Sequence, residues 1–378
     1  MDTVYLDYAA TTPLSEPARA AMDPFLRDRF GNASSVHAPG REARKAVDEA
    51  RERVAAAVGA RPDEVVFTSG GTESDNLAIK GAAWHGREQG RDGVVVSAIE
   101  HHAVLDPAKW LERQGHRLSV VGVDAGGFVK TDALASAVDA RTAIVSVMWA
   151  NNEVGTIQPI TEAARIAREA GAVFHTDAVQ GIVWLDVDAS MVDLMTLSAH
   201  KIGGPKGVGA LIVRRGVKVQ PLLHGGGQER EVRSGTYNVA SIVGFGAAIE
   251  HWVDKRAAWA SQVASLRDRL QQRLTTMLDR VRVQGESGRL PNNLHLIVEG
   301  IDGESMILLL DASGIATSQG SACSSGAAEP SHVLAAMGVS RDLAKGALRL
   351  TLGPQTTGSD VDRAAEAIIA SVERLRAR

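Results

Sequence analysis

From about residue 41 to residue 213 the sequence alternates stretches of helical periodicity with short apolar runs. A chain that alternates strands and helices in this way favours a largely parallel sheet covered by helices on both faces. We therefore predict an α/β domain with helices at residues 41–58 and 160–170, and with strands at 64–69, 93–97, 117–123, 143–149, 172–176, 193–198 and 209–213. Sheets of this class bind ligands at the carboxyl ends of their strands.

The pattern changes near Phe245. A long helical stretch is predicted at residues 246–281, followed by strands at 293–298, 315–317 and 348–352 and by helices at 303–311 and 359–378. This mixture is typical of a smaller α+β domain. We predict a large domain of residues 16–245 and a small domain formed by residues 1–15 and 246–378. The pattern alone does not determine where the N-terminal residues pack.

The composition excludes several classes of function. The 378 residues carry a formal net charge of -4 and no long basic run, so we expect no direct binding of nucleic acid. The N-terminus does not resemble a signal peptide, and no apolar run reaches the ~18 residues of a membrane span. We therefore expect a cytoplasmic protein. The single cysteine, Cys323, excludes an intrachain disulfide and a zinc site built on cysteine pairs.

Two glycines, Gly70 and Gly71, stand between a predicted strand and a helix. Backbone N–H groups at the start of a helix can bind a phosphate, which makes Gly71 and Thr72 candidate phosphate ligands. Thr72 and Asp75 also have the spacing of a capping box, so an ordinary capped helix after a tight turn is the alternative. The glycine pattern by itself does not distinguish the two interpretations.

Two further strand ends carry polar residues that suit an aromatic cofactor. Asp177 follows an apolar strand, where a carboxylate needs a partner such as a protonated pyridine nitrogen; a helix N-cap is the alternative. The next strand leads Ser198, His200 and Lys201 into a glycine-rich loop. Lysine forms Schiff bases with carbonyl groups, and the other two residues can donate to a phosphate. A solvated loop lysine is the alternative for Lys201, and is our interpretation of Lys206.

His101 ends another predicted strand. An imidazole at this place can stack on an aromatic cofactor and move protons near neutral pH. The alternative is a capping histidine. We expect no metal ion, because no cluster of acids or cysteines lies nearby in the sequence.

Cys323 and Arg349 complete the set of candidate residues. Cys323 lies among glycines and serines, which favours an accessible, reactive thiol, whereas many free cysteines are inert core residues. Arg349 stands between two leucines in a predicted strand, and a buried arginine needs an anion. A substrate carboxylate would satisfy it, and a structural salt bridge is the alternative.

Taken together, these segments resemble the cysteine desulfurases of the NifS/IscS type, which are class V aminotransferase-like enzymes with the fold type I architecture and the cofactor pyridoxal 5'-phosphate (PLP). The similarity runs through nearly the whole chain and rests on residues Tyr5–Thr12, Thr68–Asn76, Glu100–Val104, Asn151–Gly155, His175–Gln180, Ser198–Gly207, Arg233–Thr236 and Gly320–Cys323. Two residues depart from the common pattern, namely Gln319 in place of a frequent serine and Tyr237 in place of a frequent proline.

The resemblance implies a role for each cofactor-binding residue. Lys201 looks like the lysine that binds PLP covalently, Asp177 like the partner of the ring nitrogen and Gln180 like the partner of the ring hydroxyl. His101 would stack on the ring. Asn152 would also contact the cofactor. The phosphate would be held by Gly71, Thr72, Ser198 and His200, and by Thr236 from the other subunit of a homodimer.

The resemblance also implies the reaction, in which L-cysteine is converted to L-alanine and its sulfur passes to Cys323 as a persulfide. Asn152 and Arg349 would hold the substrate carboxylate, and His101 would handle the thiol proton. The sulfur would then go to an acceptor protein, such as an iron–sulfur scaffold or a tRNA-thiolation protein. The alternatives are a selenocysteine lyase, a class V aminotransferase, or a silent assembly partner that keeps the fold without the chemistry.

Overall fold

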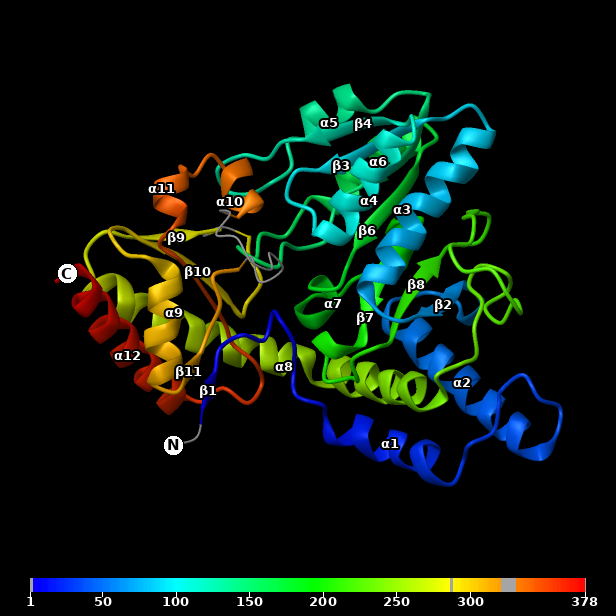
Figure 1. Ribbon diagram of the computed structural model, residues 1–378, viewed down its shortest axis with the longest axis horizontal. Helices are drawn as coiled ribbons and strands as arrows, with labels where there is room; N and C mark the ends of the chain where they lie inside the picture. The colour runs from blue at the N-terminus through cyan, green and yellow to red at the C-terminus, as the bar shows by residue number, and fades with distance from the viewer. Residues whose placement is uncertain (1–2, 286–287, 321–330, 378) are drawn as a thin grey trace.

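The computed structural model describes residues 3–285, 288–320 and 331–377, and its centre is a seven-stranded sheet (Figure 1). The strand order is β2-β8-β7-β6-β5-β3-β4. Only β8 runs antiparallel to its neighbours, and the other adjacent pairs are parallel. The mostly parallel sheet predicted from the sequence is therefore confirmed. Its strands are β2 (Val65–Thr68), β3 (Gly93–Ser97), β4 (Arg117–Val121), β5 (Thr142–Ser146), β6 (Val173–Asp177), β7 (Leu194–Ser198) and β8 (Gly209–Val213).

The helices of this region flank the sheet, and the strand residues alternate between its two faces. Val94 and Val96 of β3 pack in one apolar cluster with α3, whereas Val95 packs in a second cluster with α6. Near-continuous apolar strands are typical of sheets that are covered on both sides. The helices are α1 (Glu16–Arg27), α2 (Ala38–Ala57), α3 (Gly71–Glu88), α4 (His102–Arg113), α5 (Thr131–Ala137), α6 (Ile160–Glu169) and α7 (Gly181–Trp184), with 3-10 turns at Pro62–Glu64, Ala189–Met191 and Ala199–Lys201.

A single long helix, α8 (Val239–Met277), connects this sheet region to the rest of the chain (Figure 1). It packs on α1 and α2 and, farther along, on α12. The predicted helix at 246–281 was wrong at both ends. The helix begins earlier because the side chain of Asn238 caps it by accepting the Ser241 N–H, and it ends before a turn at Arg280, whose φ is 54°.

The C-terminal part of the chain forms a second, three-stranded antiparallel sheet with the order β12-β10-β9. Its strands are β9 (Val281–Gln284), β10 (Asn293–Val298) and β12 (Ala347–Thr351). The helices of this part of the chain are α9 (Gly303–Ala312), α10 (His332–Ala336), α11 (Arg341–Ala344) and α12 (Gly358–Arg376). The N-terminal strand β1 (Val4–Tyr5) pairs in parallel with β11 (Ile315–Ala316).

The pairing of β1 with β11 supports our proposal that residues 1–15 belong with residues 246–378. The boundary at residue 245 falls inside α8, so a continuous helix would join the two proposed domains. The division itself stays a prediction. In the part of the chain that the structure describes, no helix has the length and apolar character needed to cross a membrane.

The small sheet buries a histidine whose protonation opposes folding. His295 of β10 is fully buried opposite Arg349 of β12, and burial together with Arg349 lowers its pKa to about 3. The unfolded chain has the ordinary pKa of about 6.5. As the pH falls from 6.5 towards 3, the unfolded form gains the proton first, so the folded form loses at most about 1.4 kcal/mol of stability per pH unit.

We therefore expect the stability difference between the wild type and His295→Gln to shrink as the pH falls. The variant lacks the protonatable ring, so only the wild type experiences this acid penalty. Urea unfolding of both proteins at about pH 7 and about pH 5 measures the difference. A difference that does not change with pH would contradict a neutral, buried His295.

Candidate active site

A cavity of about 670 Å³ lies where the carboxyl ends of β6 and β7 meet the start of α3, the start of α4 and part of the C-terminal region. Most of the predicted site residues line it, namely Gly71, Thr72, His101, Asn152, Asp177, Gln180, Ser198, His200, Lys201 and Arg349. Thr236 does not line it, and Cys323 lies outside the described residues. Tertiary folding thus brings together residues that are up to 278 positions apart, from Gly71 to Arg349.

Lys201 lies in the 3-10 turn directly after β7, whose five residues are all buried. Its Nζ donates to the carbonyl oxygens of Ala9 at 2.6 Å and Ala10 at 2.7 Å. Gln180 also donates to the Ala9 oxygen, at 2.9 Å. The N-terminal segment therefore holds this amino group inside the cavity, so the solvated loop lysine does not describe Lys201. Lys206, in contrast, is exposed.

Asp177 ends β6 with its side chain buried. One oxygen accepts the N–H of Val179 at 2.9 Å, and α7 begins four residues later with Gln180 at its N-cap, so the alternative of a helix N-cap is wrong for Asp177. Burial raises its pKa to about 6, although the nearby Lys201 favours the charged form. A buried carboxyl group in this environment gains from a cationic partner.

Two further buried carboxyl groups, which the sequence analysis did not identify as site residues, lie close to Asp177. Asp75 of α3 lines the cavity with 1% of its surface exposed, and within the described chain its Oδ1 has no hydrogen-bond partner. Burial raises the pKa of Asp75 and of Glu100 well above the ordinary range, and the charge of Asp177 adds to both shifts. Asp75 lies one turn into the helix after the glycine pair, and this spacing is the signal that could have identified it.

The start of α3 differs from the predicted capping box. The helix begins at Gly71, with Gly70 at the N-cap and no side-chain cap, so Thr72 is already helical. The carboxylate of Glu73 instead accepts the N–H of Ser69 at 2.7 Å. The capping alternative fails because Gly70, with a φ of 149°, makes the turn that a non-glycine residue rarely adopts. A helix N-terminus without a side-chain cap is a favourable place for a phosphate.

Gly71 allows this helix start to approach the end of β7. A Cβ atom added at Gly71 would lie 3.2 Å from Val179 Cγ2 and 3.7 Å from Ser198 Cβ. On the other side, His200 Nδ1 lies 3.1 Å from the hydroxyl of Thr11. Burial and then the charge of Lys201 lower the pKa of His200 to about 4, so its ring is neutral at pH 7.

His101 fits both of its predicted interpretations. It is the N-cap of α4, where its Nδ1 accepts the N–H of Ala103 at 3.1 Å, and it also lines the cavity. Burial, followed by the charge of Lys201, lowers its pKa to about 4. From this hydrogen bond we infer that the neutral ring carries its proton on Nε2. Sequence analysis could not assign this tautomer.

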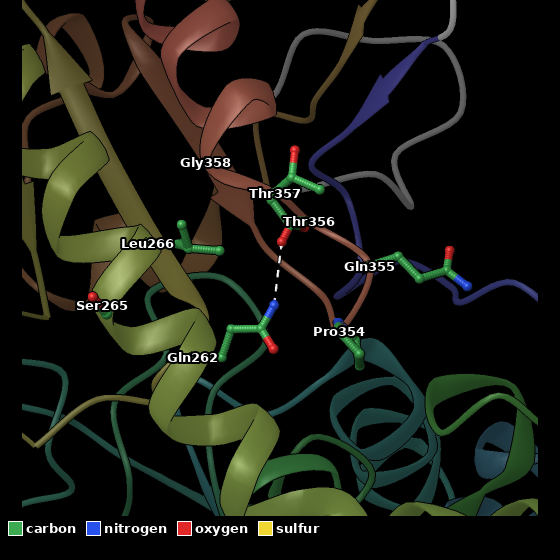
Figure 2. A pocket seen from close by; sticks show the side chains of 8 residues that line it. All are labelled: Gln262, Ser265, Leu266, Pro354, Gln355, Thr356, Thr357 and Gly358. Atoms are coloured by element: carbon green, nitrogen blue, oxygen red, sulfur yellow. Dashed lines mark hydrogen bonds between the residues drawn. The ribbon is translucent and has the colours of Figure 1, made fainter.

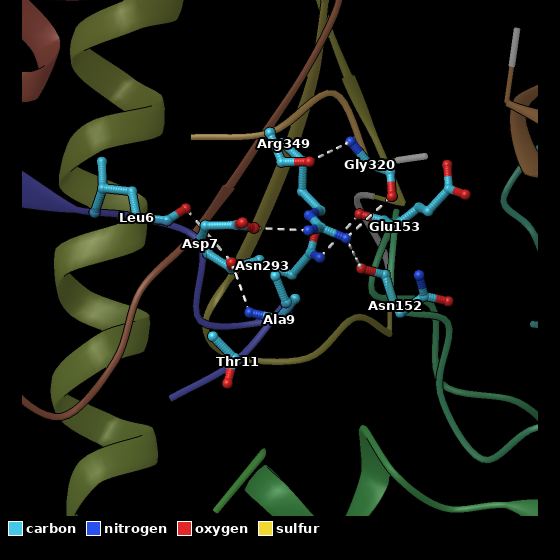
Figure 3. Close-up of polar contacts among 12 residues, drawn as sticks. Leu6, Asp7, Ala9, Thr11, Asn152, Glu153, Asn293, Gly320 and Arg349 are labelled. Atoms are coloured by element: carbon cyan, nitrogen blue, oxygen red, sulfur yellow. Dashed lines mark hydrogen bonds and ion pairs between the residues drawn. The ribbon is translucent and has the colours of Figure 1, made fainter. Parts of the chain in front are cut away.

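Arg349 also combines its two predicted interpretations, because it lines the cavity and forms a buried salt bridge (Figure 3). Its side chain is 2% exposed, and its Nη2 lies 2.7 Å from Asp7 Oδ1. Its Nη1 donates to the carbonyl oxygen of Asn152 at 3.0 Å and to that of Gly320 at 3.3 Å. Asn152 therefore contacts Arg349 through its backbone, while its side chain was predicted to bind the substrate.

Thr236 is exposed on the loop that follows β8. Ion pairs hold this loop against the rest of the chain: Arg233 Nε lies 2.8 Å from Glu73 Oε1, and Arg51 pairs with Glu229 at 2.7 Å. The predicted contact of Thr236 with the site of a second subunit stays a prediction.

A second, smaller cavity of about 420 Å³ lies between α8 and the loop before α12 (Figure 2). The side chain of Gln262 crosses it and donates to the Thr356 carbonyl oxygen at 3.5 Å. Of the predicted site residues that the structure describes, none lines it.

Comparisons with known proteins agree with this geometry. Residues 4–364 match the family model described as aminotransferase class-V. The chain is 48% identical to the cysteine desulfurase IscS of Dictyoglomus turgidum over 99% of its length and 95% of that protein. It is also 48% identical to the IscS-like cysteine desulfurase of Mycobacterium tuberculosis, over 98% of its length and 97% of that protein.

Solved structures give the same result. A NifS-like protein superposes with a TM-score of 0.93 at 38% identity, covering 99% of this chain and 100% of the other. SspA in complex with cysteine superposes with a TM-score of 0.83 at 34% identity, covering 93% of this chain and 99% of the other. The chain belongs to the class V aminotransferase family and, within it, to the cysteine desulfurases of the NifS/IscS type.

Enzymes of this family depend on PLP, and the residues of the cavity fit that group. The start of α3 has no side-chain cap and suits a phosphate, the Lys201 amino group suits an aldehyde, and the buried carboxyl of Asp177 suits a protonated ring nitrogen. The three groups face one cavity, as a single ligand requires.

We expect PLP to attach to Lys201. After incubation with PLP and reduction with borohydride, mass spectrometry of the digested protein should find the modified peptide at Lys201 in the wild type and in Lys206→Ala. Lys201→Ala should lose the modification, because no other described lysine lines the cavity. Modification that persists unchanged in Lys201→Ala would exclude Lys201 as the site of attachment.

Proposed function

We propose that this chain is a cysteine desulfurase that converts L-cysteine to L-alanine and transfers the sulfur to Cys323. The observation that carries the proposal is the shared cavity, in which Lys201 and Asp177 of the large sheet region face Arg349 of the C-terminal sheet. This combination provides groups for a cofactor and for the carboxylate of an amino acid in one site. The names of the relatives, and the cysteine complex of SspA, support cysteine as the substrate.

PLP, when bound, supplies an electron sink that weakens the bond between Cβ and sulfur of the substrate. We propose that Gly71, Thr72, Ser198 and His200 hold its phosphate. Asp177, as an anion, would keep the ring nitrogen protonated, and Gln180 would form a hydrogen bond with the ring hydroxyl. Lys201 Nζ would take up the proton of the substrate Cα, because it lines the same cavity as Arg349, the proposed carboxylate ligand.

Arg349 and Asn152 are proposed to bind and orient the carboxylate of the substrate. His101 faces the same cavity as a neutral ring, and its inferred proton on Nε2 gives it a hydrogen bond to donate. The ring can therefore donate this hydrogen bond to the sulfur of the substrate thiol. Taking up a second proton would make it a cation, which burial and the charge of Lys201 both disfavour.

Cys323 is proposed to attack the substrate sulfur as a thiolate, because the thiolate is the nucleophile. The new S–S bond forms as the bond between Cβ and sulfur breaks. The electron pair of the broken bond stays with the carbon skeleton, which takes up a proton at Cβ and becomes alanine. A persulfide would remain on Cys323, and a thiol of an acceptor protein would take the sulfur by exchange. An iron–sulfur scaffold or a tRNA-thiolation protein is the acceptor that we propose, with the enzyme working in the cytoplasm. Through the persulfide, a single cysteine can take sulfur from the substrate and then pass it to the acceptor.

The test is turnover of L-cysteine by the PLP-loaded protein in the presence of a reductant. We expect equal amounts of alanine and sulfide from the wild type, and a loss of at least about a hundredfold in Cys323→Ser, since a hydroxyl cannot form a persulfide. Full turnover in Cys323→Ser would favour an aminotransferase. A much faster reaction with selenocysteine than with cysteine would favour a selenocysteine lyase.

We further propose a homodimer in which Thr236 completes the phosphate site of the second subunit. Sedimentation should give twice the chain mass of 39.9 kDa. Thr236→Val should weaken PLP binding about threefold to tenfold, because one hydrogen bond to a charged phosphate is lost. A monomeric protein with full PLP affinity would exclude this arrangement.

A further inference from the structure

Arg349 is a buried cation whose only charged partner, within the described residues, is Asp7. Among the described residues, its guanidinium also donates to the carbonyl oxygens of Asn152 and Gly320 (Figure 3). A guanidinium group that is withdrawn from water is costly unless an anion compensates it. The ion pair with Asp7 therefore compensates the charge of Arg349 at the wall of the cavity.

Asp7 itself does not line the cavity, so it reaches the site only through Arg349. Its backbone is fixed independently of any ligand. Asp7 forms a β-bridge with Thr351, and the N–H of Thr351 donates to the Leu6 carbonyl oxygen at 2.8 Å. The hydroxyl of Tyr5 donates to the Asp7 carbonyl oxygen at 3.0 Å. Both members of the ion pair thus lie on backbone segments that are bonded to each other.

Another carboxyl group, Glu153, lies on the same wall and could in principle compete for Arg349. It is 3% exposed and accepts a hydrogen bond from the Ser331 hydroxyl. Burial raises its pKa, so it holds its proton more firmly than an exposed glutamate. The described salt bridges of Arg349 do not include it. Asp7 is accordingly the anion that fixes the guanidinium.

We propose that Asp7 is a positioning residue that holds the Arg349 guanidinium in the orientation needed to bind the α-carboxylate of an amino acid substrate. The inference deepens the proposed function and rests on it. The ligand class is an α-amino acid, since the carboxylate is the part of the substrate that Arg349 would recognise. The N-terminal segment, which also holds Lys201 through Ala9 and Ala10, therefore acts on both halves of the site.

The test compares Asp7→Asn with the wild type in the PLP-loaded enzyme. We expect KM for L-cysteine to rise about tenfold with kcat changed by less than about twofold, because the orientation of a carboxylate ligand is lost while the reacting groups stay in place. Asp7→Glu, which keeps the charge, should recover part of the affinity. Asp362→Asn is the control, since it breaks the ion pairs with Arg269 and Arg273 between α8 and α12, away from the cavity, and should leave KM unchanged.

A purely structural role would lower thermal stability and kcat without a selective effect on KM, and this result would overturn the proposal. Where Asp7→Asn does not fold, Asp7→Glu decides, because the longer side chain displaces the guanidinium and should still raise KM. Absorbance titrations of the PLP-loaded protein with L-alanine and with ethylamine give a measurement that needs no turnover. Asp7→Asn should weaken alanine binding alone, and equal binding of alanine to both proteins would contradict the proposal.

The same titrations separate this proposal from the proposed function. A wild-type protein that binds alanine but forms no sulfide from cysteine would refute desulfurase activity and leave the role of Asp7 open to confirmation by the alanine measurement. A wild-type enzyme that desulfurates cysteine, with an unchanged KM in Asp7→Asn, would refute the role of Asp7 alone.

Discussion

The N-terminal segment around Asp7 to Ala10 compensates both cations of the site, and the arrangement of the cavity depends on this. Its carbonyl oxygens hold the Lys201 amino group, and its carboxylate holds the Arg349 guanidinium. Each cation lies at the end or in the middle of a buried strand, where an uncompensated charge is costly. This short segment, which pairs with the C-terminal strands, thus contacts both Lys201, the proposed reacting group, and Arg349, the proposed ligand of the substrate carboxylate.

The electrostatic design of the cavity follows from burial. His101 and His200 are neutral because burial and the charge of Lys201 lower their pKa values. Burial and the charge of Asp177 raise the pKa values of Asp75 and Glu100. Asp177 lines the cavity, and its pKa of about 6 lets it carry a negative charge beside a protonated ring. Burial and the neighbouring charges therefore shift the pKa of each of these groups away from its ordinary value.

Much of the site was predictable from the sequence, because its residues follow strands. Asp177 ends the buried strand β6 and Lys201 lies in the turn after the buried strand β7, and the ends of adjacent parallel strands meet at one edge of a sheet. Where two local patterns pointed to different helix starts, the prediction from the sequence was wrong. Thr72 and Asp75 have the spacing of a capping box, yet Gly70 is the N-cap and the helix begins at Gly71, before Thr72. The start of α8 was missed because the prediction did not recognise Asn238 as the N-cap, whose side chain accepts the Ser241 N–H and determines the first turn.

The sequence by itself determined the class of fold, the family and the identity of most cavity residues, since periodicity and strand-end motifs are local properties of the chain. Only the tertiary structure decided how those residues are held. The ion pair of Asp7 with Arg349 joins positions 342 residues apart, and the contacts of Lys201 with Ala9 and Ala10 span nearly 200. Such contacts leave no periodic trace in the sequence. They arise because folding withdraws charges from water and the nearest available oxygen atoms must replace it.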